Sequence, residues 1–289
     1  VFTENFKYKK ATSVLVTVFI SGLLTVWGIY SIGNYGIALF ILVPVLLGFG
    51  STTLYGIDTK INYKQAINIG LISLLVYSLG LLLFAIEGLI CILMAAPFGI
   101  LFTWVGSSFG FLLTKKASIK TSASSLVLLI TLYPVLSFVE KNNKPSLSSV
   151  KTSIEIKADR NTVWNSLIEF PSLDEPSELI FRAGIAYPTD AQIHGRGVGA
   201  VRYCNFTTGG FVEPITIWDE PNLLKFSVVE QPKPLQEISF WDINAPHLHD
   251  YFVSKEGQFK LTTLDNGNTL LEGTTWYYHN IRPEFYWRP

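Results

Sequence analysis

The chain divides into a long apolar part and a second part in which short hydrophobic runs alternate with polar residues. Four stretches contain no charged residue, at 11–57, 65–86, 88–114 and 121–139. About 20 consecutive apolar residues let a helix span the core of a bilayer, and the first stretch is long enough for two such helices with a turn at residues 33–36. The pattern therefore predicts five transmembrane helices, at residues 14–33, 36–57, 66–86, 88–113 and 122–139.

Charge is distributed as unevenly as hydrophobicity. Of the 289 residues, 49% are hydrophobic and 15% are charged, whereas about a quarter of the residues of a soluble domain are charged. Residues 1–140 contain eight basic and four acidic residues, and residues 141–289 contain fourteen and eighteen. This division excludes a single soluble domain. A net charge of zero and the lack of a basic run in the sequence also argue against a nucleic-acid partner.

The lysines of the apolar part predict its orientation. They lie before the first predicted span, between the second and third, and between the fourth and fifth, at Lys7, Lys9, Lys10, Lys60, Lys64, Lys115, Lys116 and Lys120. The positive-inside rule assigns these three positions to the cytoplasm. Five spans would therefore place residues 141–289 outside the cytoplasm, whereas a fifth segment that did not cross would leave them inside.

Glu87 is the acidic residue embedded in the apolar part. A charge at membrane depth is a candidate functional group. Because Glu87-Gly88 stands where two predicted spans join, we interpret it instead as a turn at the surface. The apolar part shows no run of charges that would indicate an ion path and no internal repeat that would indicate a transporter. We therefore interpret it as an anchor or a packing surface.

The second part has the pattern of an α+β domain. Residues 141–149 form a predicted linker, and residues 150–157 alternate as a half-buried strand. Asp159 is placed to cap a helix, and a second short helix is expected from Ser172, with Glu175 completing a capping box. Five strands follow, at residues 198–206, 211–218, 223–229, 257–264 and 269–278. The Asn-Gly pair before the last of them predicts a hairpin.

This order, together with particular segments, resembles the START-like, helix-grip superfamily, also called SRPBCC, in its polyketide cyclase/dehydrase-like branch. The segments that carry the resemblance are residues 153–156 (SIEI), 158–164 (ADRNTVW), 184–188 (GIAYP), 197–204 (GVGAVRYC), 211–215 (FVEPI) and 271–277 (LEGTTWY). The later segments are similar to a group of bacterial membrane proteins in which several N-terminal spans precede this domain. The resemblance covers about residues 145–289, and the fused layout extends it to the whole chain.

The resemblance implies a fold class: a membrane all-α helical region, residues 1–140, followed by an α+β helix-grip domain, residues 150–289. In that domain a curved antiparallel sheet grips a long C-terminal helix over an apolar cavity. The sequence ends at residues 282–289, where this helix should begin, so the helix is expected to be missing from it. The expected location is a bacterial inner membrane, with the second domain outside the cytoplasm if all five spans cross.

The candidate ligand-binding residues are aromatic, because ligand pockets are mostly apolar; they are Tyr203, Phe211, Trp218, Phe226, Trp241, Phe259 and Trp276. A packed core would use the same residue types. The candidate groups for general acid-base catalysis stand at no recognisable spacing; they are Glu213, His247, His249 and His279. The histidines have no third ligand at a metal-motif spacing. Residues 195–199 are glycine-rich but precede a strand rather than the helix that a phosphate cradle needs, so neither a metal nor a cofactor is predicted.

Three functions are compatible with these observations. The first is a membrane-anchored protein whose START-like domain binds a hydrophobic ligand, such as a lipid, an isoprenoid or a polyketide, next to the bilayer. The second is an accessory subunit of a larger membrane complex, because small residues let helices approach closely; they are Gly22, Gly28, Gly48, Gly106 and Gly110. The third is a membrane-bound enzyme similar to cyclases and dehydratases. The expected partners are membrane lipids, a hydrophobic small molecule and, under the second hypothesis, other membrane proteins.

Overall fold

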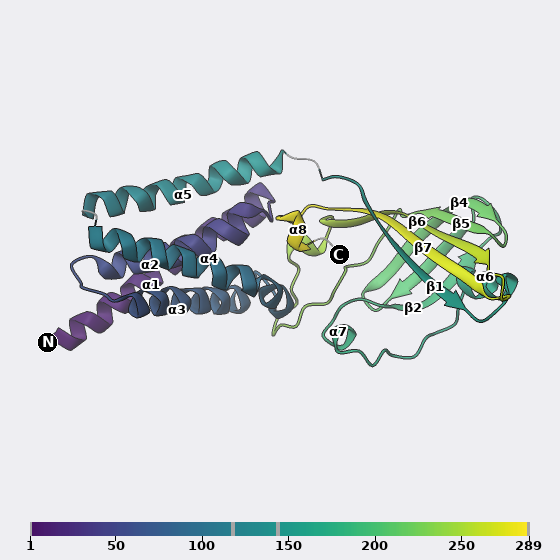
Figure 1. The fold of residues 1–289 in the computed structure, drawn as a ribbon, viewed down its shortest axis with the longest axis horizontal. Helices are drawn as coiled ribbons and strands as arrows, with labels where there is room; N and C mark the ends of the chain where they lie inside the picture. The colour runs from purple at the N-terminus through teal and green to yellow at the C-terminus, as the bar shows by residue number, and fades with distance from the viewer. Residues whose placement is uncertain (1, 117–118, 143–144, 288–289) are drawn as a thin grey trace. The chain divides into compact units, whose positions relative to one another are not determined.

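The computed structural model describes residues 2–116, 119–142 and 145–287, which fall into two compact units (Figure 1). The helical unit comprises the described residues within 1–144, together with residues 237–246 and 281–287; the sheet unit comprises residues 145–236 and 247–280. The sequence predicted a single boundary at the linker 141–149, of which residues 143 and 144 lie outside the described part. The structure instead assigns two short segments of the C-terminal half to the helical unit.

The helical unit contains five long helices that correspond to the apolar stretches. Helix α1 (Phe2–Val26) continues into a π-helical turn, η1 (Trp27–Ile32), and a second such turn, η2 (Ala38–Leu42), leads into α2 (Val43–Gly56). Helices α3 (Tyr63–Leu83), α4 (Leu89–Lys116) and α5 (Ile119–Lys141) follow. By length and composition, five helices of the described chain, the fifth included, are able to cross a membrane.

Glycines allow α2 and α4 to pack closely. A Cβ added at Gly48 would overlap the Thr103 carbonyl oxygen, and one added at Gly106 would overlap the Val45 carbonyl oxygen. Small residues at such contacts let two helix backbones approach each other. Gly22, by contrast, has open space where its Cβ would lie. Gly48 and Gly106, unlike Gly22, therefore serve helix packing within the unit.

Hydroxyl side chains are buried beside apolar ones in the interior of the helical unit, and large apolar side chains cover its outside. Hydroxyl residues recur every four positions along α1 and are all buried; they are Ser13, Thr17, Ser21 and Thr25. Thr25 shares a hydrogen bond of 2.6 Å with the hydroxyl of Tyr77 on α3. Large apolar side chains on the outer faces are exposed, among them Leu75, Leu128 and Phe138. A soluble helical bundle instead turns polar side chains outwards, so it is the apolar outer surface that sets this unit apart.

Two glutamates from distant parts of the chain cap helix N-termini in this unit. The Glu140 carboxylate, on α5, accepts a hydrogen bond from the Ile37 N–H at 2.8 Å, next to the start of η2. The Glu237 carboxylate accepts hydrogen bonds from the N–H groups of Ile90 and Cys91 at 3.0 and 3.1 Å, in the first turn of α4. Carboxylates are favoured there because the first N–H groups of a helix lack internal partners and carry the positive end of its dipole.

Glu87 lies in the turn between α3 and α4, as predicted, but it is buried. The prediction of a surface position was wrong because neighbouring turns cover it: its Oε1 accepts a hydrogen bond of 2.9 Å from the Tyr35 hydroxyl, in the turn between η1 and η2. Burial raises the pKa of Glu87 to about 8; the hydrogen bond from Tyr35 counteracts part of this rise, and the nearby Glu237 carboxylate adds to it. The turns at this end of the unit therefore form one packed layer.

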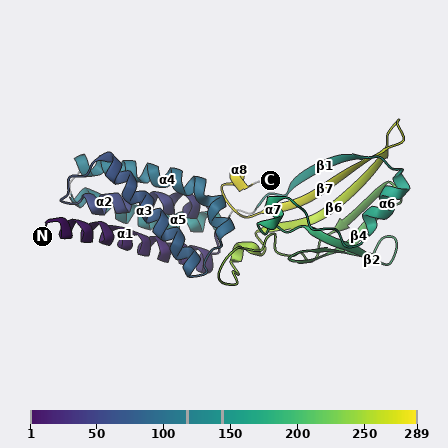
Figure 2. The same cartoon turned by 90° about the horizontal axis from the view of Figure 1, so that it is seen from below.

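The sheet unit is built on a curled, seven-stranded antiparallel sheet with the order β1-β7-β6-β5-β4-β3-β2 (Figure 2). The strands are β1 (Ser148–Ile156), β2 (Pro188–His194), β3 (Val201–Phe206), β4 (Gly209–Asp219), β5 (Leu223–Ser227), β6 (Phe252–Thr263) and β7 (Thr269–His279). The sequence predicted all of them except β2. The predicted order, a helical region followed by an antiparallel sheet, is confirmed. After β7 the described residues form one further helix, α8 (Glu284–Trp287).

The second short helix predicted from Ser172 is wrong. Residues 170–173 run along the edge strand β2 instead: the Phe170 N–H donates to the Ala191 carbonyl at 3.0 Å, and the Leu173 N–H donates to the Thr189 carbonyl at 2.7 Å. Backbone groups that a helix would pair internally are therefore paired with a strand. The short helix α7 (Leu179–Arg182) forms further along.

Helix α6 (Arg160–Ile168) packs on one face of the sheet. Asp159 caps it, as predicted, by accepting hydrogen bonds from the N–H groups of Asn161 and Thr162 at 3.0 and 3.1 Å. Trp164 is 1% exposed, and its ring contacts that of Trp218 with centroids 5.6 Å apart. The buried sheet residues of this core are Ala200, Ile215, Leu224, Phe226 and Leu261. Ile215, Leu224, Phe226 and Leu261 lie on one face of the sheet, which we call the α6 face.

Candidate functional site

The α6 face carries four of the seven aromatic residues predicted to bind a ligand. Phe226 and Phe259 are neighbours, with ring centroids 5.8 Å apart, and both pack in the core with α6. Trp218 packs there too. Phe211 lies two residues from Glu213 on β4 and belongs to the same face because side chains alternate along a strand. Three of these four residues thus build the core, which is the alternative that the sequence left open.

The other three predicted aromatic residues lie elsewhere. Tyr203 and Trp276 point to the opposite face of the sheet by the same alternation. The Lys225 ammonium lies 4.9 Å from the centroid of the Trp276 ring. Trp241 belongs to the helical unit and is largely exposed. The structure therefore does not gather the seven residues into one site.

A buried ion pair lies on the α6 face between β3 and β4. Arg202 and Glu213 stand directly opposite each other, the Arg202 guanidinium donates to the Glu213 carboxylate, and both side chains are buried. The guanidinium also lies 5.9 Å from the ring centroid of Phe226 and donates to the Ile168 carbonyl at 3.3 Å. Burial raises the pKa of Glu213, and Arg202 counteracts part of the rise. Glu213 is thus held by a cation rather than free to act as a general base.

The predicted histidines do not lie beside Glu213 in the sheet register. His247 lies in the short helix η3 (Pro246–Leu248) and is buried. Burial lowers the pKa of His247 to about 4, and His249 adds to the effect, so His247 is neutral at neutral pH. His279 ends β7 and stacks on Tyr277, with ring centroids 6.5 Å apart.

Part of the α6 face extends beyond α6. On β1, Val150 pairs with Thr275, and Ile154 pairs with Leu271, which packs against the core. Directly paired residues share a face of the sheet, so Val150 and Ile154 belong to the α6 face, yet they are 39% and 60% exposed. We call Val150 and Ile154 the apolar strip of β1. The alternation of residues 150–157 placed both residues on one face of a strand, but the sequence did not show that they would be exposed.

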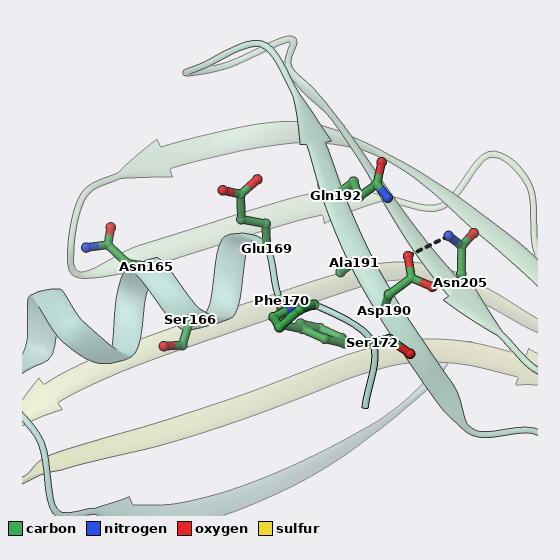
Figure 3. Close-up of a pocket in the computed structure, with 10 residues that line it drawn as sticks. Asn165, Ser166, Glu169, Phe170, Ser172, Asp190, Ala191, Gln192 and Asn205 are labelled. Carbon is green, nitrogen blue, oxygen red and sulfur yellow. Dashed lines mark hydrogen bonds between the residues drawn. The ribbon is translucent and has the colours of Figure 1, made fainter. Parts of the chain in front are cut away.

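An open pocket lies at the sheet edge, where α6 ends and β2 runs (Figure 3). Its volume is about 830 Å³, and most of its lining side chains are polar. Among them, Asp190 accepts a hydrogen bond from the Asn205 amide at 2.8 Å, while Glu169 and Gln192 are exposed. None of the residues predicted from the sequence lines this pocket. Its polarity differs from the apolar cavity that the resemblance implies.

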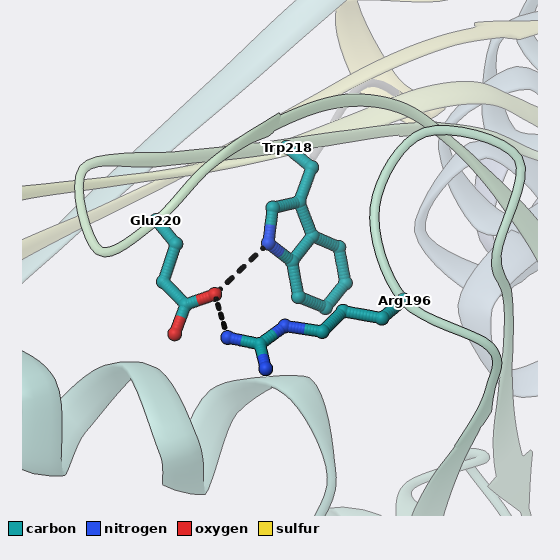
Figure 4. A network of polar contacts seen from close by, with 3 residues as sticks. All are labelled: Arg196, Trp218 and Glu220. Carbon is teal, nitrogen blue, oxygen red and sulfur yellow. Dashed lines mark hydrogen bonds and ion pairs between the residues drawn. The ribbon is translucent and has the colours of Figure 1, made fainter.

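The glycine-rich segment 195–199 is a turn before β3, as the sequence predicted. Its three glycines all have positive φ, which glycine adopts without strain. Arg196 donates to the Glu220 carboxylate at 2.9 Å, and the Trp218 indole N–H donates to the same oxygen at 3.1 Å (Figure 4). Because Arg196 is mostly exposed, this network ties two turns of the sheet together rather than enclosing a ligand.

Comparisons with known proteins give a limited result. No protein-family model matches the chain. No curated protein matches it either.

Several solved structures are similar to part of the chain. A protein from Nitrosospira multiformis is 19% identical, with a TM-score of 0.30 and 47% of this chain and 83% of that chain covered. Truncated norcoclaurine synthase from Thalictrum flavum is 15% identical, with a TM-score of 0.30 and coverages of 50% and 81%. Major latex-like protein 151 from Panax ginseng is 18% identical, with a TM-score of 0.29 and coverages of 49% and 87%. At such scores the similarity carries no functional argument.

Proposed function

We propose that the chain is an integral membrane protein whose sheet unit binds a hydrophobic molecule next to the bilayer. The apolar outer surface of the helical unit carries the first part of this proposal. Its interior holds buried hydroxyl groups such as Ser21 and Thr25, and its outer faces expose large apolar side chains such as Leu75 and Phe138. Soluble monomers rarely expose large contiguous apolar patches, whereas lipid tails cover such a surface.

The apolar strip of β1 supports the second part. Val150 and Ile154 lie beside the core on the α6 face but are not covered by α6. A hydrophobic molecule that lay along this strip would remove apolar surface from water, which is worth roughly 25 cal/mol for each Å² buried. The strip, rather than the polar pocket at the β2 edge, is therefore the binding surface we propose.

Native mass spectrometry of the full-length chain in detergent tests the binding proposal. We expect one retained hydrophobic molecule per chain, identified after extraction of the same sample. Val150→Glu should reduce its retention several-fold because a carboxylate would lie on the strip. Ser149→Glu is the matched control: the neighbouring side chain points to the opposite face and is exposed, so its retention should equal that of the parent.

Three outcomes would contradict this proposal. Equal retention in both variants would show that the strip is not the binding surface. An empty chain that co-purifies with a stoichiometric membrane protein would favour the accessory-subunit hypothesis. Turnover of a substrate would favour the enzyme hypothesis; loss of that turnover in Glu213→Gln, His247→Ala, His249→Ala or His279→Ala would then identify the group responsible.

We also propose that the sheet unit lies outside the cytoplasm. The support is the predicted pattern of basic connections, together with the finding that all five helices are able to cross a membrane by length and composition. Reporter fusions that are active on one side of the membrane, joined at Val198 in an exposed turn of the sheet unit, test the orientation. Activity of a cytoplasmic reporter at this position would contradict it.

A further inference from the structure

The two C-terminal segments of the helical unit carry strongly exposed aromatic side chains. In the segment 237–246, Phe240 is 95% exposed and Trp241 is 58% exposed. In α8, Phe285 is 81% exposed. The sequence suggested a ligand-binding role for Trp241 and the start of a gripping helix for residues 282–289. Neither interpretation explains why three large rings of the helical unit should face solvent.

Hydrogen bonds fix both segments to the beginning of α4. The Leu89 N–H donates to the Ile238 carbonyl at 3.2 Å, and Glu237 caps the same helix turn. The Tyr286 hydroxyl donates to the Met94 carbonyl at 2.6 Å. Phe240, Trp241 and Phe285 therefore lie within a few residues of groups that are hydrogen-bonded to the first two turns of α4.

Contacts of α8 reach a little further along α4. The ring of Phe98 lies 4.4 Å from that of Tyr286 and 6.2 Å from that of Phe285, measured between centroids. Met94, one turn before Phe98, is 44% exposed, and Leu101, three residues after it on the same side of α4, is 51% exposed. The exposed side of α8 is thus continuous with the outer apolar surface of the helix.

The length of α4 sets the depth of these contacts. Its candidate span, Leu89–Lys115, has 27 residues, which at 1.5 Å per residue gives about 40 Å. The hydrocarbon core of a bilayer is about 30 Å thick, and about 40–45 Å with both headgroup regions. If α4 spans the membrane, its first turns therefore lie in the headgroup region. Aromatic rings, Trp and Tyr above all, are favoured at this level.

We propose that Ile238, Phe240, Trp241 and Phe285 form an interfacial anchor that inserts into the headgroup region of the bilayer. This inference rests on the proposed membrane crossing and adds a second kind of membrane contact, made by residues from the C-terminal half. The occupant of this surface is a lipid interface because the rings continue the outer surface of α4 and because hydrogen bonds hold their segments at that depth. The anchor fixes the segment between β5 and β6 and the segment after β7 at the membrane surface.

Site-directed spin labelling measures the depth of these residues. A parent with Cys91→Ala and Cys204→Ala receives one cysteine at a time, at Phe240 or Phe285, and is reconstituted into vesicles of phosphatidylcholine and phosphatidylglycerol. The reference positions are Leu75→Cys in the middle of α3 and Val198→Cys in an exposed turn of the sheet unit. The measured quantity is the ratio of label accessibility to oxygen, which concentrates in lipid, and to a water-soluble nickel chelate.

We expect the ratio at positions 240 and 285 to be several-fold higher than at Val198 and lower than at Leu75. A ratio equal to that at Val198, with a lipid-like ratio at Leu75, would overturn the anchor but leave the membrane crossing intact. A water-like ratio at Leu75 would instead overturn the membrane crossing on which the anchor rests. Labels at 240 and 285 shielded from both relaxing agents would show that a second copy or another protein covers this surface, which also overturns the anchor.

Discussion

The helical unit buries many hydroxyl side chains beside its apolar core and exposes large apolar ones, whereas the core of the sheet unit is mostly apolar. Ser21 and Thr103 are fully buried in the helical unit, where Leu75 is 60% exposed. In the sheet unit, Trp164 and Leu224 are fully buried, and lysines and glutamates such as Lys151 and Glu272 pair at the surface. The two units therefore differ most at their surfaces, which carry large apolar side chains on the helices and charged ones on the sheet; the proposed membrane crossing would account for this difference.

Each unit also contains an exception that sharpens this contrast. The sheet unit buries one charged pair, Arg202 and Glu213, within its apolar face. The helical unit buries the Glu140 carboxylate at one end, where it accepts a hydrogen bond from the Ile37 N–H beside the start of η2. In both cases the buried charge has specific hydrogen-bond partners, as a buried charge requires.

The largest effect is expected from Gly106→Leu, which disrupts the close packing of α2 and α4. The new side chain would overlap the Val45 carbonyl, and because backbone cannot rotate away, α2 and α4 would have to separate. Overpacking that neighbouring side chains can absorb costs about 1–3 kcal/mol. A clash with backbone must cost more because it separates two helices, so we expect little or no folded protein in detergent by size-exclusion chromatography. Gly22→Leu is the control, since space is open there; equal yields of the two variants would refute the packing role.

Trp164→Ala removes a buried ring from the core of the sheet unit. Replacing a buried Trp by Ala typically costs about 3–5 kcal/mol, and Trp164 is 1% exposed. We expect the thermal transition of the sheet unit, followed by near-ultraviolet circular dichroism, to shift to a clearly lower temperature. Trp276→Ala, on the opposite face, should shift it less. Equal shifts would contradict the assignment of the core to the α6 face.

Arg202→Met tests the charged exception in the sheet unit. It leaves Glu213 buried without its cation, and breaking a buried pair in this way costs about 3 kcal/mol. The double variant Arg202→Met with Glu213→Leu should regain part of that loss because it leaves no unpaired charge. A double-mutant cycle on the free energy of unfolding measures the coupling. Additive effects would show that the two side chains do not depend on each other.

Glu87→Gln tests the buried carboxyl at the end of the helical unit through pH. The pKa of Glu87 is raised to about 8 by burial, against an ordinary value near 4.5. Its contribution to stability is therefore fully present below pH 4.5 and is lost as the pH rises towards 8. Between about pH 5.5 and 7 the parent should lose about 1.4 kcal/mol per pH unit through this group. Thermal unfolding of Glu87→Gln in detergent should show a correspondingly flatter pH profile.

The smallest effect is expected from Glu237→Ala, which removes the cap of α4. Loss of a helix cap costs about 0.5–2 kcal/mol, and Glu237 caps with both carboxylate oxygens. Hydrogen exchange at Ile90 and Cys91 should become faster, while exchange in the sheet unit stays the same. Asp242→Ala is the control, because this exposed residue lies in the same segment. Faster exchange in both variants would indicate general loosening of the segment rather than loss of a cap.

The sequence predicted elements better than it predicted the site. The five long helices, α6 and six of the seven strands were recognised because each has its own run of apolar residues or its own alternation. Strand β2 was missed because Pro188–His194 mixes polar residues with a proline and shows no clear apolar alternation. Of the predicted aromatic residues, Phe226 and Phe259 fall in the core, whereas Trp241 falls in the other unit. Nothing in the local pattern separates these outcomes.

What the sequence determined by itself is the kind of element in each part, long apolar helices and then strands, because the hydrophobicity of a 20-residue run and the period of a strand are local properties. What only the tertiary structure decided is which distant residues complete each unit. Glu237 caps α4 from about 150 positions away, and α8 bonds to Met94 from further still. A cap of this kind depends on where the chain returns in space, and so do the exposure of Phe240 and the pairing of Arg202 with Glu213. The types of these residues alone do not specify where they lie in space.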